Sequence, residues 1–276
     1  MGCGRPPIKG EIRVKVQDFG HFDDAVTLFG GPYSNIHALE ALVSIQNGRP
    51  AICTGDVVAY AADPAACVDV MRRLAWPLVA GNCEVQIAEE AADCGCGFDE
   101  DMTCNTLSRT WYPFALAAMD KDARDWMGTL PDIGTFVQKN RRYAVIHGGF
   151  SAINRFLWPS SDASDFAYEI SALEDAIGPV DGVVAGHSGI PFHRWIDKHH
   201  WINAGAIGMP PHDGRPETRY AVLEDGDVSF HRLAYDHASA RAAMEAAGLT
   251  QGYDVAMDTG FWPSEDILPA PLRRSA

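Results

Sequence analysis

Short apolar runs that end in glycine recur along the first part of the chain, and stretches with helical periodicity follow them. The first two runs are 25–29 and 51–54. Apolar residues then recur at helical spacing over 36–45 and 64–74. Strands that alternate with helices in this way are typical of a parallel α/β sheet, so we expect an α/β fold.

Further strands and helices are expected along the rest of the chain. The pattern predicts strands at 11–16, 76–80, 142–146, 182–185, 192–196, 201–204, 219–223 and 228–233, and helices at 114–130, 164–177 and 236–247. The segment 84–112 is rich in Cys, Gly and Asp, and we expect an irregular loop there. No long linker divides the chain. We therefore predict an N-terminal extension (1–24), one domain (25–248) and a tail that wraps the surface (249–276).

Charge and composition exclude several classes of function. The 276 residues carry a formal net charge of -15, and the longest basic clusters, 139–142 and 273–274, are short, so nucleic acid is not an expected partner. No apolar run approaches the ~20 residues that cross a bilayer, so no membrane partner is expected. The seven cysteines are an odd number, as is typical of a reducing compartment, and the predicted location is the cytoplasm.

Four of the expected strands end beside a glycine and a side chain that can bind a metal. These side chains form the four-ligand set, Asp56, Asn82, His147 and His187. Functional groups of open α/β sheets gather beyond the carboxyl ends of the strands. A mixed oxygen and nitrogen set suits Mn, Fe, Zn or Co better than Ca. From the residues alone, a metal site and a set of ordinary turns with hydrogen-bonded histidines both stay open.

Six successive motifs carry a resemblance to a known family. They are "FGGPYSNIHALEAL", "CTGDVVAYAADP", "VAGNCE", "VIHGG", "VVAGHSGIPFHR" and "WINAGAIGMPPHDGRPETRYAVLE". Over 25–233 the chain resembles the calcineurin-like metallophosphoesterases, most closely the bacterial branch with small phosphodiesterases and diadenosine tetraphosphatase-like proteins. The resemblance implies a four-layer α/β/β/α sandwich with two metals at the sheet edge, and hydrolysis of phosphomonoesters or phosphodiesters.

The chain departs from the family motifs at the ligands of one metal. The family's first motif, Asp-x-His-Gly-Asn, aligns on Asn35, which puts Gly31 and Tyr33 at the Asp and His positions. The second histidine of the family's Gly-His-x-His is Gly189 here. The resemblance implies that the four-ligand set holds the other metal. We therefore expect one divalent ion rather than two.

Three cysteines lie in or near the third motif. Cys83 stands where the family has its catalytic histidine, and three interpretations stay open: a soft metal ligand, a redox-sensitive thiol, or a small buried residue. Cys94 and Cys96 follow in the next loop. They are either additional metal ligands or incidental residues of an ordered loop, because their spacing is too tight for an ordinary zinc knuckle.

The expected function is an atypical metal-dependent phosphoesterase that acts on a small phosphorylated molecule, such as a phosphomonoester, phosphodiester or nucleotide. Asn82 and Cys83 would be catalytic, and Tyr33 and Asn35 would bind the substrate. Two alternatives are a phosphoesterase-like binding or sensor module without turnover, and a thiol-assisted metal-binding protein. The sequence leaves the oligomeric state open.

Overall fold

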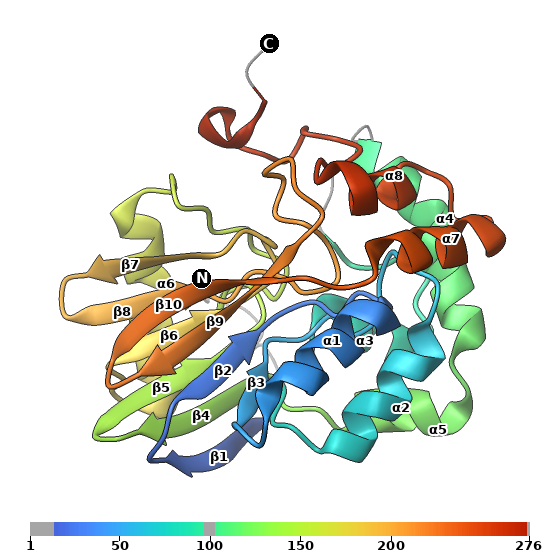
Figure 1. The fold of residues 1–276 in the computed structure, drawn as a ribbon. Coiled ribbons are helices and arrows are strands. Elements are labelled where there is room, and N and C mark those ends of the chain that lie inside the picture. Colours follow the sequence, from blue (N-terminus) through green and yellow to red (C-terminus); the bar gives the residue numbers. More distant parts are fainter. Residues whose placement is uncertain (1–13, 97–102, 275–276) are drawn as a thin grey trace, which may run out of the picture.

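Two β-sheets form the centre of the computed structural model, which describes residues 14–96 and 103–274 (Figure 1). The larger sheet has the strand order β1-β4-β5-β6-β8-β7. Its strands are β1 (Val16–Phe22), β4 (Ile133–Gln138), β5 (Arg141–Val145), β6 (Gly182–Ala185), β7 (Phe192–Ile196) and β8 (His199–Asn203). β5, β6 and β8 run parallel, so the loops after β5 and β6 leave the sheet at the same edge.

The smaller sheet has the order β10-β9-β2-β3. It consists of β2 (Val26–Phe29), β3 (Ala51–Cys53), β9 (Thr218–Glu224) and β10 (Asp227–Leu233). β2 and β3 are parallel, with Leu28 opposite Ile52, whereas β9 and β10 form an antiparallel hairpin. Like β5 and β6 in the larger sheet, the parallel pair sends its two following loops toward one edge.

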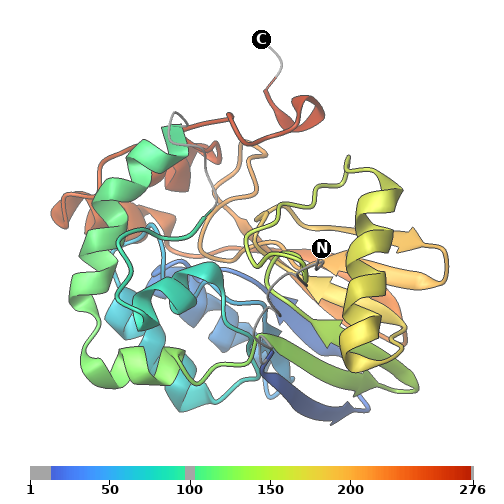
Figure 2. The same cartoon turned by 180° about the vertical axis from the view of Figure 1, so that it is seen from behind.

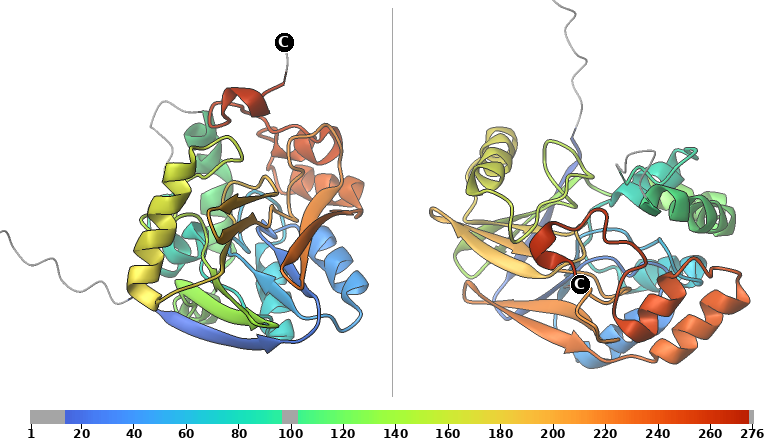
Figure 3. Two further views of the ribbon diagram at one scale, coloured as in Figure 1. Left: turned by 90° about the vertical axis from the view of Figure 1, so that its left-hand side faces the viewer. Right: turned by 90° about the horizontal axis from the view of Figure 1, so that it is seen from above.

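Apolar side chains fill the space between the sheets, and helices cover both outer faces. Residues such as Leu28, Phe136 and Val184 form the core between the sheets. α6 (Ala163–Ile177) packs its Phe166 and Ile170 on the outer face of the larger sheet (Figure 2). On the smaller sheet lie α1 (Ile36–Gln46) and α2 (Pro64–Leu74). The view from above shows the layers, and the predicted α/β/β/α sandwich is confirmed (Figure 3).

The remaining helices pack beside the smaller sheet on the same side as α1 and α2 (Figure 1). They are α3 (Asn82–Ala88), α4 (Thr103–Ala118), α5 (Lys121–Met127), α7 (His237–Ala246) and α8 (Tyr253–Thr259). A 3-10 turn at Ala270–Leu272 lies apart from them, near the C-terminus (Figure 1). None of the described helices is long and apolar enough to cross a membrane.

Three of the expected segments between 76 and 130 differ from the structure. The predicted loop 84–112 contains most of α3 and the first part of α4. The predicted helix 114–130 is two helices, because Asp120 begins a new one by accepting a hydrogen bond from the Ala123 N–H at 2.8 Å. β4 was not predicted. The expected strand at 76–80 makes only one isolated bridge, from Leu78 to Cys53.

The two ends of the chain also differ from the expectation. The predicted strand 11–16 meets the structure only at its last residue, since β1 begins at Val16 and residues 11–13 lie outside the described part. The predicted surface tail 249–276 contains α8. Its residues Tyr253 and Trp262 line a cavity, so this segment contributes a wall of the candidate site rather than only wrapping the surface.

Candidate metal centre

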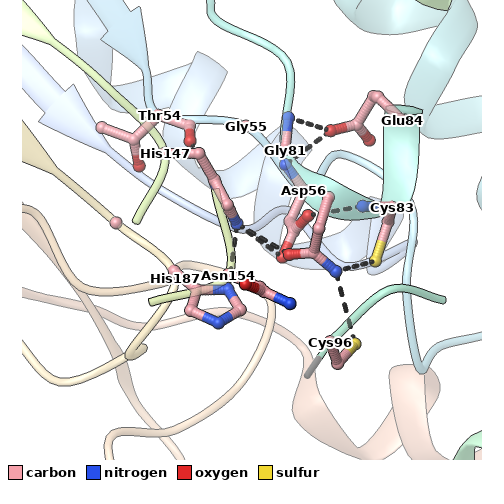
Figure 4. Close-up of polar contacts among 12 residues, drawn as sticks. Thr54, Gly55, Asp56, Gly81, Cys83, Glu84, Cys96, His147, Asn154 and His187 are labelled. Atoms are coloured by element: carbon pink, nitrogen blue, oxygen red, sulfur yellow. Dashed lines mark hydrogen bonds and ion pairs between the residues drawn. The ribbon is translucent and has the colours of Figure 1, made fainter. Parts of the chain in front are cut away.

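Loops from both sheets bring the four-ligand set together at one edge. Asp56 follows β3, His147 follows β5, His187 follows β6, and Asn82 is the first residue of α3. His147 Nε2 lies 3.0 Å from Asn82 Oδ1, 3.1 Å from His187 Nδ1 and 3.3 Å from Asp56 Oδ2 (Figure 4). Among the described residues, Asp56, His147 and His187 form a group with ligand atoms within 4.8 Å of one another. This geometry could hold a small cation.

The hydrogen bonds around this site leave its lone pairs facing each other. His147 Nδ1 donates to the Thr54 carbonyl at 2.6 Å, which leaves Nε2 with a lone pair in the neutral ring. The amide nitrogen of Asn82 donates to the Cys94 carbonyl at 2.8 Å, so its oxygen faces His147 Nε2. Acceptor atoms that converge in a buried place need a proton or a cation between them. The residues present fit a divalent metal.

The pKa values of Asp56, His147 and His187 describe the charge of the centre when no metal is bound. Burial raises the pKa of Asp56, but His147, His187 and a hydrogen bond from the Cys83 N–H together lower it more, and the net pKa is below its usual value. Burial lowers the pKa of His147, and the Asp56 carboxylate reverses this, so the net pKa is raised. Burial and His147 together lower the pKa of His187 to about 3. Without a metal, a proton on His147 therefore offsets the charge of the Asp56 carboxylate. A divalent metal would take the place of this proton.

The backbone at the ligands has an uncommon conformation. Asp56 and His187 have φ angles of 56° and 60°, in the left-handed region that side chains other than glycine seldom adopt. Gly81 is required beside them, because a Cβ there would lie 2.2 Å from Asp56 Oδ1. The sequence signal for this crowding was visible as the glycines that precede three of the four ligands.

Glu84 is a buried positioning residue that the sequence analysis did not single out. Its carboxylate accepts hydrogen bonds from the backbone N–H groups of Asp56 at 2.7 Å, Gly81 at 2.9 Å and Val58 at 3.2 Å. It thereby joins the loop after β3 to the start of α3. Burial and the nearby Asp56 raise the pKa of Glu84 to about 7. A glutamate three residues after the N-cap Gly81 is the signal that could have identified both the helix and this role.

One tyrosine covers the positions where the family has the ligands of its other metal. A Cβ at Gly31 would lie 2.3 Å from the Tyr33 ring, so the ring occupies the space of a side chain at 31. At the other end, a Cβ at Gly189 would lie 3.8 Å from Tyr33 Oη and 3.4 Å from the Trp262 ring. Tyr33 thus extends from position 31 to position 189, and a larger residue at 31 would overlap with its ring.

Asn35 lies outside the cavity that Tyr33 lines. Its side-chain oxygen caps α1 by accepting from the Ala38 N–H at 3.1 Å, and its amide donates to the Gly208 carbonyl at 3.0 Å. The side chain is 1% exposed. The side-chain amide of Asn35 therefore stabilises the first turn of α1. For this reason we do not include Asn35 in the proposed substrate site.

The three cysteines lie around the amide nitrogen of Asn82. Cys83 is 1% exposed, its thiol does not line the cavity, and its N–H donates to Asp56 Oδ1 at 3.3 Å. The Asn82 amide donates to Cys96 Sγ at 3.3 Å, and Cys94 Sγ lies 2.7 Å from Cys96 Sγ. In the part of the chain that the structure describes, no cysteine joins the possible ligand group of Asp56 and the two histidines.

A cavity opens directly above the centre. The space between atoms there amounts to about 620 Å³, with open solvent at its mouth included. Asp56 and His187 form its floor, and Tyr33 and Cys96 lie beside them. The walls come from segments that the sequence analysis did not connect with the site, including the loop after β5 and the C-terminal segment.

The fold and the centre define a two-sheet α/β/β/α protein with side chains at the sheet edge that could hold a metal ion. The sequence matches the calcineurin-like phosphoesterase superfamily domain over residues 33–226, which is more than half of the chain. The chain therefore belongs to the calcineurin-like phosphoesterase superfamily, as the motifs predicted. Members of the metallophosphoesterase family depend on divalent metals.

Individual relatives agree with this assignment. The uncharacterized protein MJ0912 of Methanocaldococcus jannaschii is 24% identical over 226 residues, which are 74% of this chain and 85% of that protein. A metallophosphoesterase from Sphaerobacter thermophilus superposes with a TM-score of 0.69 at 22% identity, over 87% of this chain and 100% of that one. The protein PH1004 of Pyrococcus horikoshii superposes with a TM-score of 0.72 at 14% identity, over 86% and 98%. At these identities, the two structures show that the fold is shared.

Proposed function

We propose that this protein hydrolyses a small phosphoester with one divalent metal ion held by the four-ligand set. The observation that carries the proposal is that acceptor atoms converge at one point. Two oxygens and a nitrogen of a second imidazole lie within 3.3 Å of His147 Nε2. Membership of the superfamily supports phosphoester hydrolysis as the reaction. The ion is Mn, Fe, Zn or Co, because nitrogen ligands disfavour Ca and Mg.

The ion, when bound, supplies Lewis-acid polarisation of a phosphoryl oxygen. The protein supplies the rigid frame around it. The Thr54 carbonyl keeps the proton of His147 on Nδ1, the Cys94 carbonyl orients the Asn82 amide, and Glu84 fixes the Asp56 loop. A centre whose ligands are already oriented loses little entropy when the substrate binds.

Tyr33 takes over part of the space of the missing ion. Burial and Asp56 raise the pKa of Tyr33 well above its usual value, so the phenol keeps its proton and can donate a hydrogen bond to a phosphoryl oxygen. A neutral donor stabilises developing negative charge less than a second cation does. We therefore expect slower turnover than a two-metal centre would give.

Cys83 contributes through its backbone rather than its thiol. A hydrogen bond with Cys96 lowers the pKa of the Cys83 thiol, but burial and Asp56 outweigh this effect. The net pKa is well above its usual value, so the thiol stays neutral. A buried, neutral thiol off the cavity is a poor proton donor to a leaving group. Of the three interpretations of Cys83, we favour the small buried residue, and Asn82 acts as a metal ligand whose oxygen faces His147 Nε2.

A hydrolysis panel with a matched variant tests the proposal. The manganese-loaded protein should hydrolyse at least one phosphomonoester or phosphodiester, and Asp56→Asn should abolish the activity while Asp69→Asn, an exposed change on α2, leaves it intact. Metal-replete protein without turnover on any ester would overturn the proposal.

The second candidate is a module that binds a phosphorylated ligand without hydrolysis. The position of the Tyr33 ring over Gly31 favours it, because this ring removes the space for a second ion. In that case a phosphate analogue would bind the metal-loaded protein and no ester would be consumed. The cytoplasmic location and the absence of nucleic-acid and membrane partners remain predictions from the sequence.

A further inference from the structure

The cavity above the metal centre is built largely from aromatic rings. Five aromatic side chains line it, and Met209, Ile267 and Ala206 complete its apolar surface. The rings come from four separate parts of the chain: Tyr33 after β2, Tyr60 after β3, Phe156 after β5, and Tyr253 and Trp262 from the C-terminal segment. Such a surface matches a flat apolar group, which stacks on rings and leaves water on binding.

The aromatic wall is held firmly in place. The indole N–H of Trp262 donates to the Pro210 carbonyl at 2.7 Å, and its backbone N–H donates to His212 Nδ1 at 2.9 Å. The other nitrogen of His212 lies 2.8 Å from Glu265. On the opposite side, Tyr60 packs against Tyr33 and Tyr253 with ring centroids 4.9 and 4.5 Å apart. The walls are thus set before any ligand arrives, which lowers the entropic cost of binding.

The charges around the cavity limit how many phosphates the ligand carries. Asp56 is the only acidic residue among the described residues that line it, and no lysine or arginine does. A polyphosphate chain needs several cationic groups along it. Among the described residues that line the cavity, none would add a positive charge to that of the proposed ion, and the protein has a formal net charge of -15. The cavity therefore disfavours nucleoside polyphosphates and dinucleoside polyphosphates.

We propose that the substrate carries a single phosphoryl group esterified to an uncharged planar aromatic group, such as an aryl ring or a nucleobase on its sugar. The phosphoryl group lies at the four-ligand set, and the planar group lies between Tyr60, Phe156 and Trp262. This assignment rests on the proposed function, because it places the phosphoryl group at the metal. A quaternary ammonium group would also find rings here, but Asp56 is the only carboxylate among the described residues that line the cavity, which favours the uncharged group.

Binding of non-hydrolysable phosphonates to the manganese-loaded protein tests the assignment without depending on turnover. Calorimetry should show phenylphosphonate binding at least about tenfold more tightly than methylphosphonate, because the phenyl ring adds burial and stacking. Phosphocholine and tripolyphosphate, the latter with equimolar manganese, should also bind at least about tenfold more weakly than phenylphosphonate. Equal binding of the two phosphonates, or tighter binding of either other probe, would overturn the assignment.

Two variants and a control locate the effect in the aromatic wall. Trp262→Leu should reduce the preference for phenyl over methyl to less than about threefold, with methylphosphonate affinity unchanged. Ile267→Trp should fill the cavity and weaken phenylphosphonate alone by about tenfold, which keeps the test valid if Trp262→Leu does not fold. Trp195→Leu, a change on β7 where the indole is 52% exposed, should alter neither. An unchanged preference in folded Trp262→Leu, or in Ile267→Trp, would contradict the assignment.

The outcome also separates this assignment from the proposed function. If phenylphosphonate is preferred but no ester is hydrolysed, the ligand class holds and the hydrolase proposal fails. If esters are hydrolysed without any preference for the phenyl group, the hydrolase proposal holds and the ligand class is wrong.

Discussion

The metal centre has two halves, one at the positions of each metal of the family, and they differ in the side chains that fill them. In the retained half, four side chains from three loops and a helix direct acceptor atoms at one point around His147. In the vacated half, Gly31 and Gly189 carry no side chain, and the Tyr33 ring covers both positions. The Tyr33 ring thus fills the space that a side chain at position 31 would need. Under our proposal this second half is part of the substrate cavity, which Tyr33 and Gly189 line.

The largest effect is expected from removing the only carboxylate of the retained half. Asp56→Asn should reduce kcat/KM by about a thousandfold or more, because it removes the charge that holds the ion, and the ion's Lewis-acid contribution is several kcal/mol. Metal content measured by mass spectrometry should fall in parallel. Activity within tenfold of the wild type would mean that the retained half is not the centre. Asp69→Asn on α2 serves as the control.

The vacated half can be tested by restoring a side chain under the tyrosine. Gly31→Asp should lower the free energy of unfolding by about 2 kcal/mol, since the new Cβ overlaps the Tyr33 ring and the backbone has a φ of 37°. Denaturant unfolding measures this change. Adding Tyr33→Ala should recover part of the loss, and the double-mutant cycle should show coupling of at least about 0.5 kcal/mol. Independent, additive effects would mean that the ring does not occupy this space.

The metal affinity of the retained half should depend on pH. The raised pKa of His147 means that the metal-free protein holds a proton there below that pKa, and this proton must leave when the metal binds. His187, with a pKa of about 3, is already neutral. The affinity for manganese should therefore rise with pH, by up to about tenfold per unit, and level off above the pKa of His147. Calorimetric titration between pH 5 and pH 8 checks the slope, and an affinity that is constant or falls with pH would contradict it.

The smallest effect is expected at Cys83. Cys83→Ala should change kcat by less than about threefold, because the thiol is buried, neutral and off the cavity, while the backbone N–H that contacts Asp56 remains. Cys67→Ala, a buried change on α2, is the control for general loss of packing. A fall in kcat of a hundredfold or more at Cys83 alone would restore the thiol to a catalytic or ligand role.

Local patterns predicted much of this fold. α2 matches its predicted range because Pro64 sets its first turn, and the strands that precede the ligands are short apolar runs that end in glycine. The prediction was wrong over 84–112, where the Cys-, Gly- and Asp-rich composition suggested a loop. The capping glutamate at Glu84 carried the opposite signal and was not weighed.

The cavity could not be predicted in the same way. Its walls depend on where the C-terminal segment docks, and the Pro- and Gly-rich composition of that segment says nothing about its distant partners. Trp262 meets Tyr33 over Gly189 although the three residues are far apart in the sequence. Pairing of this kind depends on tertiary packing, whereas the metal ligands follow strands whose ends are set by local pattern.

The number of metal ions per chain tests the contrast between the two halves most directly. Protein saturated with manganese, measured by metal analysis and by anomalous scattering from crystals, should contain one ion, within coordination distance of Asp56, Asn82, His147 and His187. The variant with Gly31→Asp, Tyr33→His and Gly189→His together should contain two. Two ions in the wild-type protein, or an ion away from those four side chains, would contradict the proposal.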